Sequence, residues 1–314
     1  MNRLPLFEAL KDSRRVLLAG AGGGYDIFSG LPLYLKLKAL GKDVFLANYS
    51  ISPLENVEQI SDLPLYEINA ESDGLVDYFP EKYLCQWLDT NDQAPASIYC
   101  LERSGLVPFQ RAYQHLVNSL DLDTVILVDG GTDSLLRGDE PDLATPSEDL
   151  TSVAAVHSLD IPCKLLCCIG FGVDTFHGVC HHYVLQAVAD LTRSGHFLGA
   201  FSLMQEFEEA QKLKSAAEYV FSCMPKVPSI VLSSILDSLS GEFGNHHATE
   251  RTHGSVLYIN PLMSLYWSFK LDGVAERCLY LDRLEGSQTC NEILIEIERF
   301  RGHNERKPWK DIPL

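Results

Sequence analysis

Positive charge is scarce in this 314-residue sequence. Lys and Arg number 25 against 43 Asp and Glu, which gives a formal net charge of −18 at pH 7. Proteins that bind nucleic acids or anionic membranes gain affinity from cationic surfaces, so this balance argues against both partners. A small anionic ligand remains compatible with the composition, because backbone amides at a helix N-terminus bind phosphate without net positive charge.

Several motifs that would assign a class directly are also missing. The sequence contains no C-x-x-C pair, no G-x-S-x-G elbow, no Walker lysine and no full H-E-x-x-H pattern. Its first glycine loop also lacks the spacing of a dinucleotide-binding loop. No apolar run approaches the length of a membrane span, and the N-terminal residues do not resemble a signal peptide. Nine cysteines, several inside apolar runs, indicate a reducing compartment, so we predict a cytoplasmic protein.

What the sequence does contain is a repeated unit of apolar run, glycines and aspartate. Residues 15–20 form an apolar run that enters a glycine loop, and a helical pattern and a second apolar run at 44–47 follow. Such a unit predicts two parallel strands joined by a right-handed helical crossover. Further predicted strands lie at 65–68, 97–101, 124–128 and 163–169. We therefore predict a three-layer Rossmann-like α/β fold with a mostly parallel sheet.

The domain organisation is predicted from the absence of linkers and low-complexity tracts. One α/β domain over residues 1–314 is the simplest interpretation. Residues 50–92 show a weak pattern and are interpreted as an excursion or a sheet edge. Beyond about residue 225 the strands give way to loops and helices, including an apolar, proline-initiated helix predicted at 261–272. A helical, cap-like portion over 225–314 is the alternative to a fully integrated domain.

Three glycine- and aspartate-rich loops follow predicted strands. Ligands of open parallel sheets bind beyond the carboxyl ends of the strands, so we expect these loops to face one pocket. Their aspartates are Asp26, Asp129, Asp133 and Asp174. The glycines expected to bring backbone amides to a ligand are Gly22, Gly23, Gly24, Gly130 and Gly131. The alternative is that the glycines only make tight turns and that each aspartate caps the following helix.

Clustered carboxylates have two chemical uses. They bind a hard cation such as Mg²⁺ or Ca²⁺, or one of them holds a proton for general acid–base chemistry. The number of carboxylates favours a divalent cation, and the predicted metal ligands are Asp129, Asp133 and Asp139. The predicted catalytic residues are Asp129, Asp133, Asp174 and His177, with His177 as a proton carrier because imidazole titrates near neutral pH.

Two further patterns involve cationic or metal-binding side chains. Arg251 is predicted to pair with an anionic group of the ligand, and a surface ion pair is the alternative. Histidines gather in two groups, one at 177, 181 and 182 and the other at 246, 247 and 253. Histidines four residues apart on a helix can bind a transition metal, so a histidine-based metallohydrolase is a second alternative.

The sequence resembles an uncharacterised family, domain of unknown function 1152. The resemblance spans about residues 15–300 and implies one integral unit without an established reaction. It rests on Gly22–Asp26, Val128–Asp133, Gly138-Asp139-Glu140, Gly170–Asp174, Asn260–Met263 and Tyr266-Trp267.

Together these patterns predict an enzyme that binds a small polar ligand at the strand ends. The ligand is expected to be phosphorylated or nucleotide-like, and the reaction to be hydrolysis or group transfer assisted by a divalent cation. A non-catalytic ligand-binding sensor or regulatory module would use the same pocket and is the rival hypothesis. Self-association into a homo-oligomer is compatible with the sequence.

Overall fold

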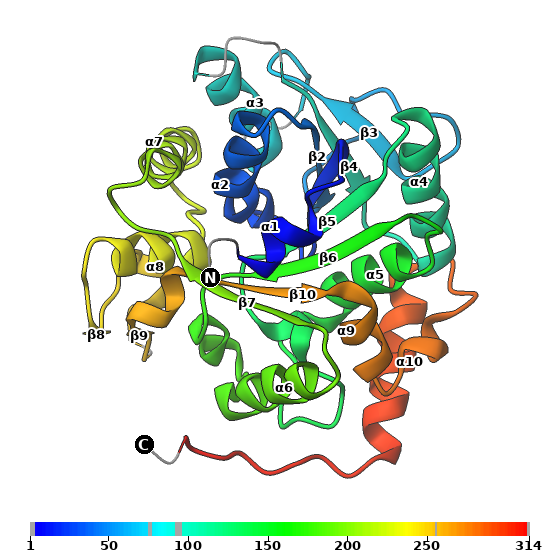
Figure 1. Ribbon diagram of the computed structural model, residues 1–314, viewed down its shortest axis with the longest axis vertical. Helices are drawn as coiled ribbons and strands as arrows, with labels where there is room; N and C mark the ends of the chain where they lie inside the picture. Colours follow the sequence, from blue (N-terminus) through cyan, green and yellow to red (C-terminus); the bar gives the residue numbers. More distant parts are fainter. Residues whose placement is uncertain (1–3, 75–76, 92–95, 255, 313–314) are drawn as a thin grey trace.

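The chain forms a Rossmann-like three-layer α/β fold, seen in a computed structural model in Figure 1. The structure describes residues 4–74, 77–91, 96–254 and 256–312, so the first three residues of the predicted N-terminal segment lie outside it. An eight-stranded, mostly parallel sheet lies between two layers of helices. Within these described ranges, no helix combines the length and the apolar character needed to cross a membrane.

The sheet has the strand order β3-β4-β2-β1-β5-β6-β10-β7. Strands β1, β2, β4, β5 and β6 run parallel, whereas β3 and β10 are antiparallel to their neighbours. The strands are β1 Arg15–Gly20, β2 Asp43–Ser50, β3 Leu65–Ile68, β4 Ile98–Glu102, β5 Thr124–Asp129, β6 Cys163–Cys168, β7 Phe197–Ser202 and β10 Leu265–Lys270. A separate two-stranded sheet pairs β8 (Gly244–Asn245) with β9 (Tyr258–Ile259).

The central strands are apolar on both faces because helices cover both faces of the sheet. In β1, Leu17 and Ala19 pack into one hydrophobic cluster, and Val16 and Leu18 pack into the other. This alternation follows from the two-residue period of a strand. One helical layer contains α1 Pro5–Ala9, α2 Asp26–Ala39, α3 Pro80–Asn91, α7 Glu208–Cys223 and α8 Ile230–Leu239. The other contains α4 Leu106–Ser119, α5 Pro146–His157, α6 His181–Arg193, α9 Leu271–Arg277 and α10 Cys290–His303.

The direction of the crossovers reverses between β1 and β5. From β1 the chain passes to β2 and β4 on one side, then returns to build β5 and β6 on the other side. Such a reversal leaves a crevice between the two loops that leave the adjacent strands, and this crevice is where open α/β sheets bind ligands. Asp26 begins α2 directly after the loop that follows β1, and Asp129 ends β5, so the topology places both residues at the switch point.

The prediction of a helix at 261–272 is wrong. The residues instead form a single 3₁₀ turn, η4 (Pro261–Ser264), followed by strand β10 between β6 and β7. Asn260 caps the turn by accepting a hydrogen bond from the Leu262 amide at 3.0 Å. Three of the six residues of β10 are aromatic, a type that fits the pleated, buried surface of a sheet. Tyr266 packs on one face of the sheet and Phe269 on the other.

The position of β10 also decides how the C-terminal portion relates to the rest of the chain. This portion is largely helical, as predicted, but β10 is an internal strand of the main sheet. Part of the portion beyond residue 225 therefore belongs to the main sheet. The weakly patterned region 50–92 contains the edge strand β3, which matches the strand predicted at 65–68, and the helix α3, which was not predicted.

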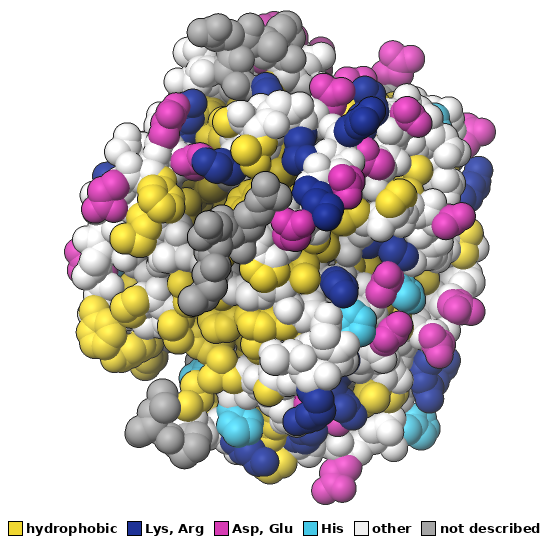
Figure 2. All heavy atoms as spheres, viewed as in Figure 1, with side chains coloured by type: hydrophobic (Ala, Val, Ile, Leu, Met, Phe, Trp, Pro, Cys, Tyr) yellow, Lys and Arg dark blue, Asp and Glu magenta, His cyan; other side chains and the backbone are white. Residues whose placement is uncertain are grey.

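The surface around β8 and β9 is locally apolar. Figure 2 shows hydrophobic side chains gathered at the lower left, where Figure 1 places α8 and the two short strands. Phe243 and Tyr258 are exposed there, with their ring centroids 5.3 Å apart. Elsewhere on this face, Lys and Arg are interspersed with Asp and Glu.

Candidate functional site

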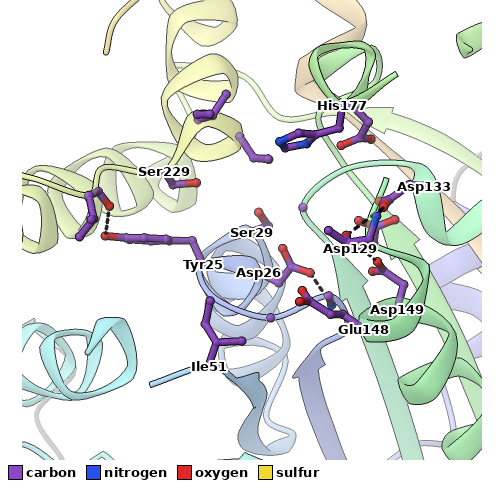
Figure 3. A pocket seen from close by; sticks show the side chains of 18 of the residues that line it. Tyr25, Asp26, Ser29, Ile51, Asp129, Asp133, Glu148, Asp149, His177 and Ser229 are labelled. Atoms are coloured by element: carbon purple, nitrogen blue, oxygen red, sulfur yellow. Dashed lines mark hydrogen bonds between the residues drawn. The ribbon is translucent and has the colours of Figure 1, made fainter. Parts of the chain in front are cut away.

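A cavity of about 390 Å³ lies at the carboxyl ends of the central strands. The structure brings all three glycine- and aspartate-rich loops to it, together with the segment before α8 and the short helix η3 (Glu250–Thr252). Figure 3 shows Asp26, Asp129, Asp133 and His177 among the residues that line it. The predicted residues that line it are Gly22, Gly23, Asp26, Asp129, Gly130, Asp133, Asp174, His177 and Arg251.

The loop after β1 depends on two glycines with left-handed backbone conformations. Gly23 has a φ of 94° and Gly24 a φ of 61°, a region that side-chain-bearing residues rarely adopt. Asn48 of β2 stabilises this turn. It is fully buried and donates a hydrogen bond to the Gly24 carbonyl at 3.0 Å. The Asn48 amide also donates to the buried Glu81 at 2.9 Å. This network holds the first turn of α2, and with it Asp26, at the cavity.

Three carboxylates converge at the floor of the cavity. One oxygen from each of Asp26, Asp129 and Asp149 lies within 4.8 Å of the other two. Asp149 stands in the first turn of α5 and is 1% exposed. Its Oδ2 accepts a hydrogen bond from the Thr145 hydroxyl at 3.3 Å, but its buried Oδ1 has no hydrogen-bond partner among the described residues. A buried carboxylate oxygen without a partner is costly, and it points to a missing cation or proton.

Backbone amides donate hydrogen bonds to Asp26 and Asp129. The Gly22 amide donates to Asp26 Oδ2 at 2.7 Å, and the Ser134 amide donates to Asp129 Oδ2 at 3.2 Å. The Ser134 hydroxyl donates a further, short hydrogen bond to the same oxygen of Asp129. These donors favour the ionised form of the two carboxyl groups. They also fix the orientation of Asp26 and Asp129 at the cavity.

Two more aspartates are held in the same way on the side of His177. The Thr132 amide donates to Asp174 Oδ2 at 2.6 Å. The amide and hydroxyl of Thr145 each donate to Asp133 Oδ2 at 3.1 Å. In the described part of the chain, neither aspartate is the N-cap of the element that follows it. Helix capping alone therefore does not explain these side chains.

Three of the predicted glycines leave room for carboxylates of the cluster. An added Cβ at Gly22 would lie 2.5 Å from Asp149 Oδ1, and one at Gly130 would lie 2.6 Å from Asp26 Oδ1. At Gly131, which does not line the cavity, a Cβ would lie 2.8 Å from an oxygen of Asp174. The Gly22 amide is already bonded to Asp26, so the expectation that it binds a ligand is corrected. These glycines are required because the carboxylates pack against their Cα atoms.

Burial raises the pKa of all five aspartates in this cluster, and repulsion from neighbouring carboxylates adds to the rise for all of them except Asp133. Burial is the largest cause for each of Asp26, Asp129, Asp133, Asp149 and Asp174. Together with the charge of Asp133, burial raises the pKa of Asp129 to about 8, although Ser134 opposes the rise. Burial also raises the pKa of Glu148 to about 7, against the charge of Arg103. At neutral pH the cluster must therefore hold protons or a cation.

Some predicted residues lie outside the cavity. Asp139 forms an ion pair with Lys307 at 2.8 Å and another with Arg137 at 3.4 Å, so the structure does not place it with the other predicted metal ligands. Its neighbour Glu140 is buried and accepts a hydrogen bond from the Gly138 amide at 2.8 Å. The Gly138-Asp139-Glu140 segment is thus structural. Gly24 supports the first loop but is not part of the cavity lining.

The histidines do not form a common site. His177 lines the carboxylate cavity, whereas His181 lines a separate, mainly apolar cavity beside Phe171. In the second group, His246 is close to Asp237 at 3.6 Å, and the rings of His247 and His253 are nearly perpendicular, with centroids 5.8 Å apart. Among the described residues, the three aspartates are the group whose ligand atoms are close enough for a shared ion.

Several residues of the cavity were not predicted. Glu148 and Asp149 come from the first turn of α5, and Tyr25, Tyr78 and the Ser229–Val231 segment form the opposite wall. Acidic residues in a first helical turn are common because they complement the helix dipole, so they gave no distinct signal. The only available indication was that this helix follows the central aspartate loop in the chain.

The model of one protein family matches most of the chain. The model described as "Protein of unknown function (DUF1152)" matches residues 17–306. The chain belongs to this family. The DUF1152 match begins before Gly22 and ends after Arg251, so it includes every residue that lines the cavity. Searches of curated proteins and of solved structures gave no match.

Proposed function

We propose that this DUF1152 protein is an enzyme that depends on a divalent cation. Asp26, Asp129 and Asp149 bind the cation, and the cavity takes a small polar, phosphorylated or nucleotide-like ligand. The reaction is hydrolysis or group transfer at the strand ends. This proposal keeps the predicted cation but replaces Asp139 with Asp26 and Asp149 as ligands, because Asp139 is ion-paired outside the cavity.

The single observation that carries the proposal is the buried Oδ1 of Asp149. It has no hydrogen-bond partner among the described residues, and it belongs to a group of three carboxylates with oxygens within 4.8 Å of one another. Oxygens bound to one Mg²⁺ lie about 2.1 Å from the ion, hence about 3–4 Å from each other. A small inward movement of the three side chains would therefore complete the site.

A cation also accounts for the charge of the cavity better than protons do. Shared protons would leave the amides of Gly22 and Ser134 donating to neutral carboxyl groups, which are weaker acceptors. A divalent cation allows all three carboxylates to be ionised while it neutralises their repulsion. Mg²⁺ or Mn²⁺ is favoured over Ca²⁺, because only three carboxylates converge and Ca²⁺ prefers six to eight oxygen ligands.

The surrounding residues suit metal-assisted chemistry. A bound cation would polarise an oxygen of the ligand or lower the pKa of a bound water. His177 lines the cavity on the side of Asp133 and Asp174 and is exposed, so it can exchange a proton with solvent. In this proposal His177 carries the proton, while Asp133 and Asp174 position the ligand.

The cation site is tested by Mn²⁺ binding, measured by electron paramagnetic resonance and calorimetry. One Mn²⁺ per chain is expected, and Asp149→Asn is expected to weaken its binding by about tenfold or more. Asp139→Asn is the control, since it makes the same chemical change at an ion-paired aspartate outside the cavity. A folded protein that binds no Mn²⁺, or equal losses in both variants, would overturn the proposal.

A measurement of turnover distinguishes the enzyme hypothesis from the hypothesis of a non-catalytic sensor. The Mn²⁺-loaded protein is screened against phosphorylated sugars, nucleotides and related esters. An enzyme is expected to lose turnover in Asp133→Asn or His177→Gln while Mn²⁺ still binds, because these residues lie outside the three-aspartate group. If ligands bind in the screen but none is ever consumed, the sensor hypothesis replaces the enzyme.

We also infer that the protein works in a reducing compartment such as the cytoplasm. All nine cysteines are free thiols. Burial raises the pKa of Cys100 and Cys168 well above the ordinary value, so both remain protonated and unreactive. They act as small apolar residues of the core.

A further inference from the structure

The cavity has two ends of opposite charge. Asp129, Asp133 and Asp149 lie on one side of Asp26, and Tyr25 and Ser229 lie on the other (Figure 3). Among the described residues that line the cavity, Arg251 provides the only Lys or Arg side chain. The end formed by Tyr25 and Ser229 is the end where Arg251 is held.

A hydrogen bond joins Arg251 to the segment that precedes α8. Its Nη1 donates to the carbonyl oxygen of Pro228 at 2.9 Å, and Pro228 directly precedes Ser229, the N-cap of α8. The Tyr25 hydroxyl donates to the neighbouring carbonyl of Val227 at 3.1 Å. The carbonyls of Val227 and Pro228 are adjacent in the chain, so Tyr25 and Arg251 are bonded to the same short segment. Arg251 and the positive end of the α8 dipole therefore share one wall.

The opposite end of the cavity does not suit an anionic group. Six carboxyl side chains line that end: Asp26, Asp129, Asp133, Glu148, Asp149 and Asp174. A single divalent cation neutralises only part of this charge, so a phosphate placed there would still face a net negative surface. Uncharged oxygens, such as sugar hydroxyls, are favoured because they bind the cation as neutral ligands and donate hydrogen bonds to carboxylates.

Asp133 and Asp174 are arranged to accept such hydrogen bonds. Each uses Oδ2 for donors of the chain itself, Thr145 in one case and Thr132 in the other. Both aspartates line the cavity. The second oxygen of each is therefore available to a ligand hydroxyl.

We propose that the ligand is a phosphorylated sugar, free or within a nucleotide, bound in one orientation. Its phosphate lies at Arg251 and the first turn of α8, and its hydroxyls lie at the cation, Asp133 and Asp174. This assignment rests on the proposed cation site. It places the phosphate away from the metal, so the bond that reacts belongs to the sugar end of the ligand.

The recognition of phosphate is tested with ribose 5-phosphate, ribose and a panel of hexose and nucleoside monophosphates. The phosphorylated compounds are expected to bind more tightly than their unphosphorylated counterparts. Arg251→Gln is expected to remove about tenfold or more of that preference while Mn²⁺ affinity stays unchanged. Arg193→Gln, which alters an 80% exposed arginine on α6, is the matched control. A preference equal in both variants, or no binding across the panel, overturns the proposal.

The orientation is tested by the relaxation of the ³¹P nucleus in the complex with Mn²⁺. A phosphate at Arg251 is expected to show weak paramagnetic relaxation, because it does not coordinate the metal. Strong relaxation typical of direct coordination overturns the orientation even if the cation site itself is correct. If Mn²⁺ does not bind at all, the proposed function fails. The comparison of Arg251→Gln with the control then still tests whether the phosphate of the ligand binds at Arg251.

Discussion

The carboxylate of Asp149 lies in the first turn of α5, where the helix dipole favours negative charge. It faces Asp26 and Asp129 across a gap that no donor of the described chain fills. At this scale the cavity is a set of acceptors. Asp26, Asp129, Asp133 and Asp174 each accept a hydrogen bond from a backbone amide, and Asp149 accepts one from the Thr145 hydroxyl. The Oδ1 of Asp149 has no partner among the described residues, and a cation would satisfy it.

Gly22→Ala is expected to weaken Mn²⁺ binding by about tenfold while the fold is retained. The backbone of Gly22 is not left-handed, so the effect comes from the Cβ, which would lie 2.5 Å from Asp149 Oδ1. Calorimetric titration with Mn²⁺ measures the change. Gly302→Ala is the control, because a Cβ there meets no atom within 4 Å. Unchanged affinity in Gly22→Ala would show that Asp149 does not bind the ion.

The aspartates that follow strands could be predicted from the sequence, but their partners could not. Asp26 and Asp174 each follow an apolar run and glycines, Asp129 lies between an apolar run and two glycines, and strand ends in a parallel sheet share one edge. Asp149 has no such sequence signal, because its position depends on how α5 packs in three dimensions. Asp139 was included wrongly, since its sequence neighbourhood is acidic but its side chain turns toward Lys307.

At the scale of the elements, β10 couples the C-terminal portion to the sheet that carries the site. It pairs with β6, whose end leads into the loop of Asp174. The Gly170 amide in that loop donates to the Met263 carbonyl of η4 at 3.0 Å. The sequence suggested a helix here because a proline precedes an apolar run, and such a run does not distinguish a buried helix from a buried strand.

Phe269→Ala is expected to lower the free energy of unfolding by about 3–5 kcal/mol. The side chain is 0% exposed and packs against Phe197 of β7, with ring centroids 5.3 Å apart. Ile295→Ala on α10 is the control, because Ile295 is 53% exposed and should cost less than about 1 kcal/mol. Denaturant unfolding measures both. Similar small losses in the two variants would contradict an internal position for β10.

At the scale of the whole molecule, the net charge of −18 and the buried carboxylates act in the same direction. Both make the folded state unfavourable when every acidic group is ionised. A cation in the cavity removes part of this repulsion. The stability of the protein is therefore expected to depend jointly on pH and on divalent cations.

The stabilisation by Mg²⁺ is expected to grow as the pH rises from about 5 to about 8. Asp129 has a folded-state pKa of about 8 against an ordinary value of 3.8, so the folded chain holds more protons than the unfolded chain between these values. Without metal, the stability contributed by this group is present below the ordinary pKa and is lost as the pH rises through the folded pKa. Mg²⁺ replaces the proton and reverses the loss.

The measurement is the thermal midpoint in EDTA and in MgCl₂ across this pH range. The gap between the two curves should widen with pH in the wild type and remain small in Asp149→Asn. An identical gap at every pH would mean that Mg²⁺ does not replace protons in the cluster.

The most direct test of the cation site is a crystal structure of the protein grown with MnCl₂, with diffraction recorded at the manganese absorption edge. An anomalous peak is expected about 2 Å from carboxylate oxygens of Asp26, Asp129 and Asp149. A peak at Asp139 instead, or no peak in a cavity where Asp149 Oδ1 binds a proton or a water, would contradict the account.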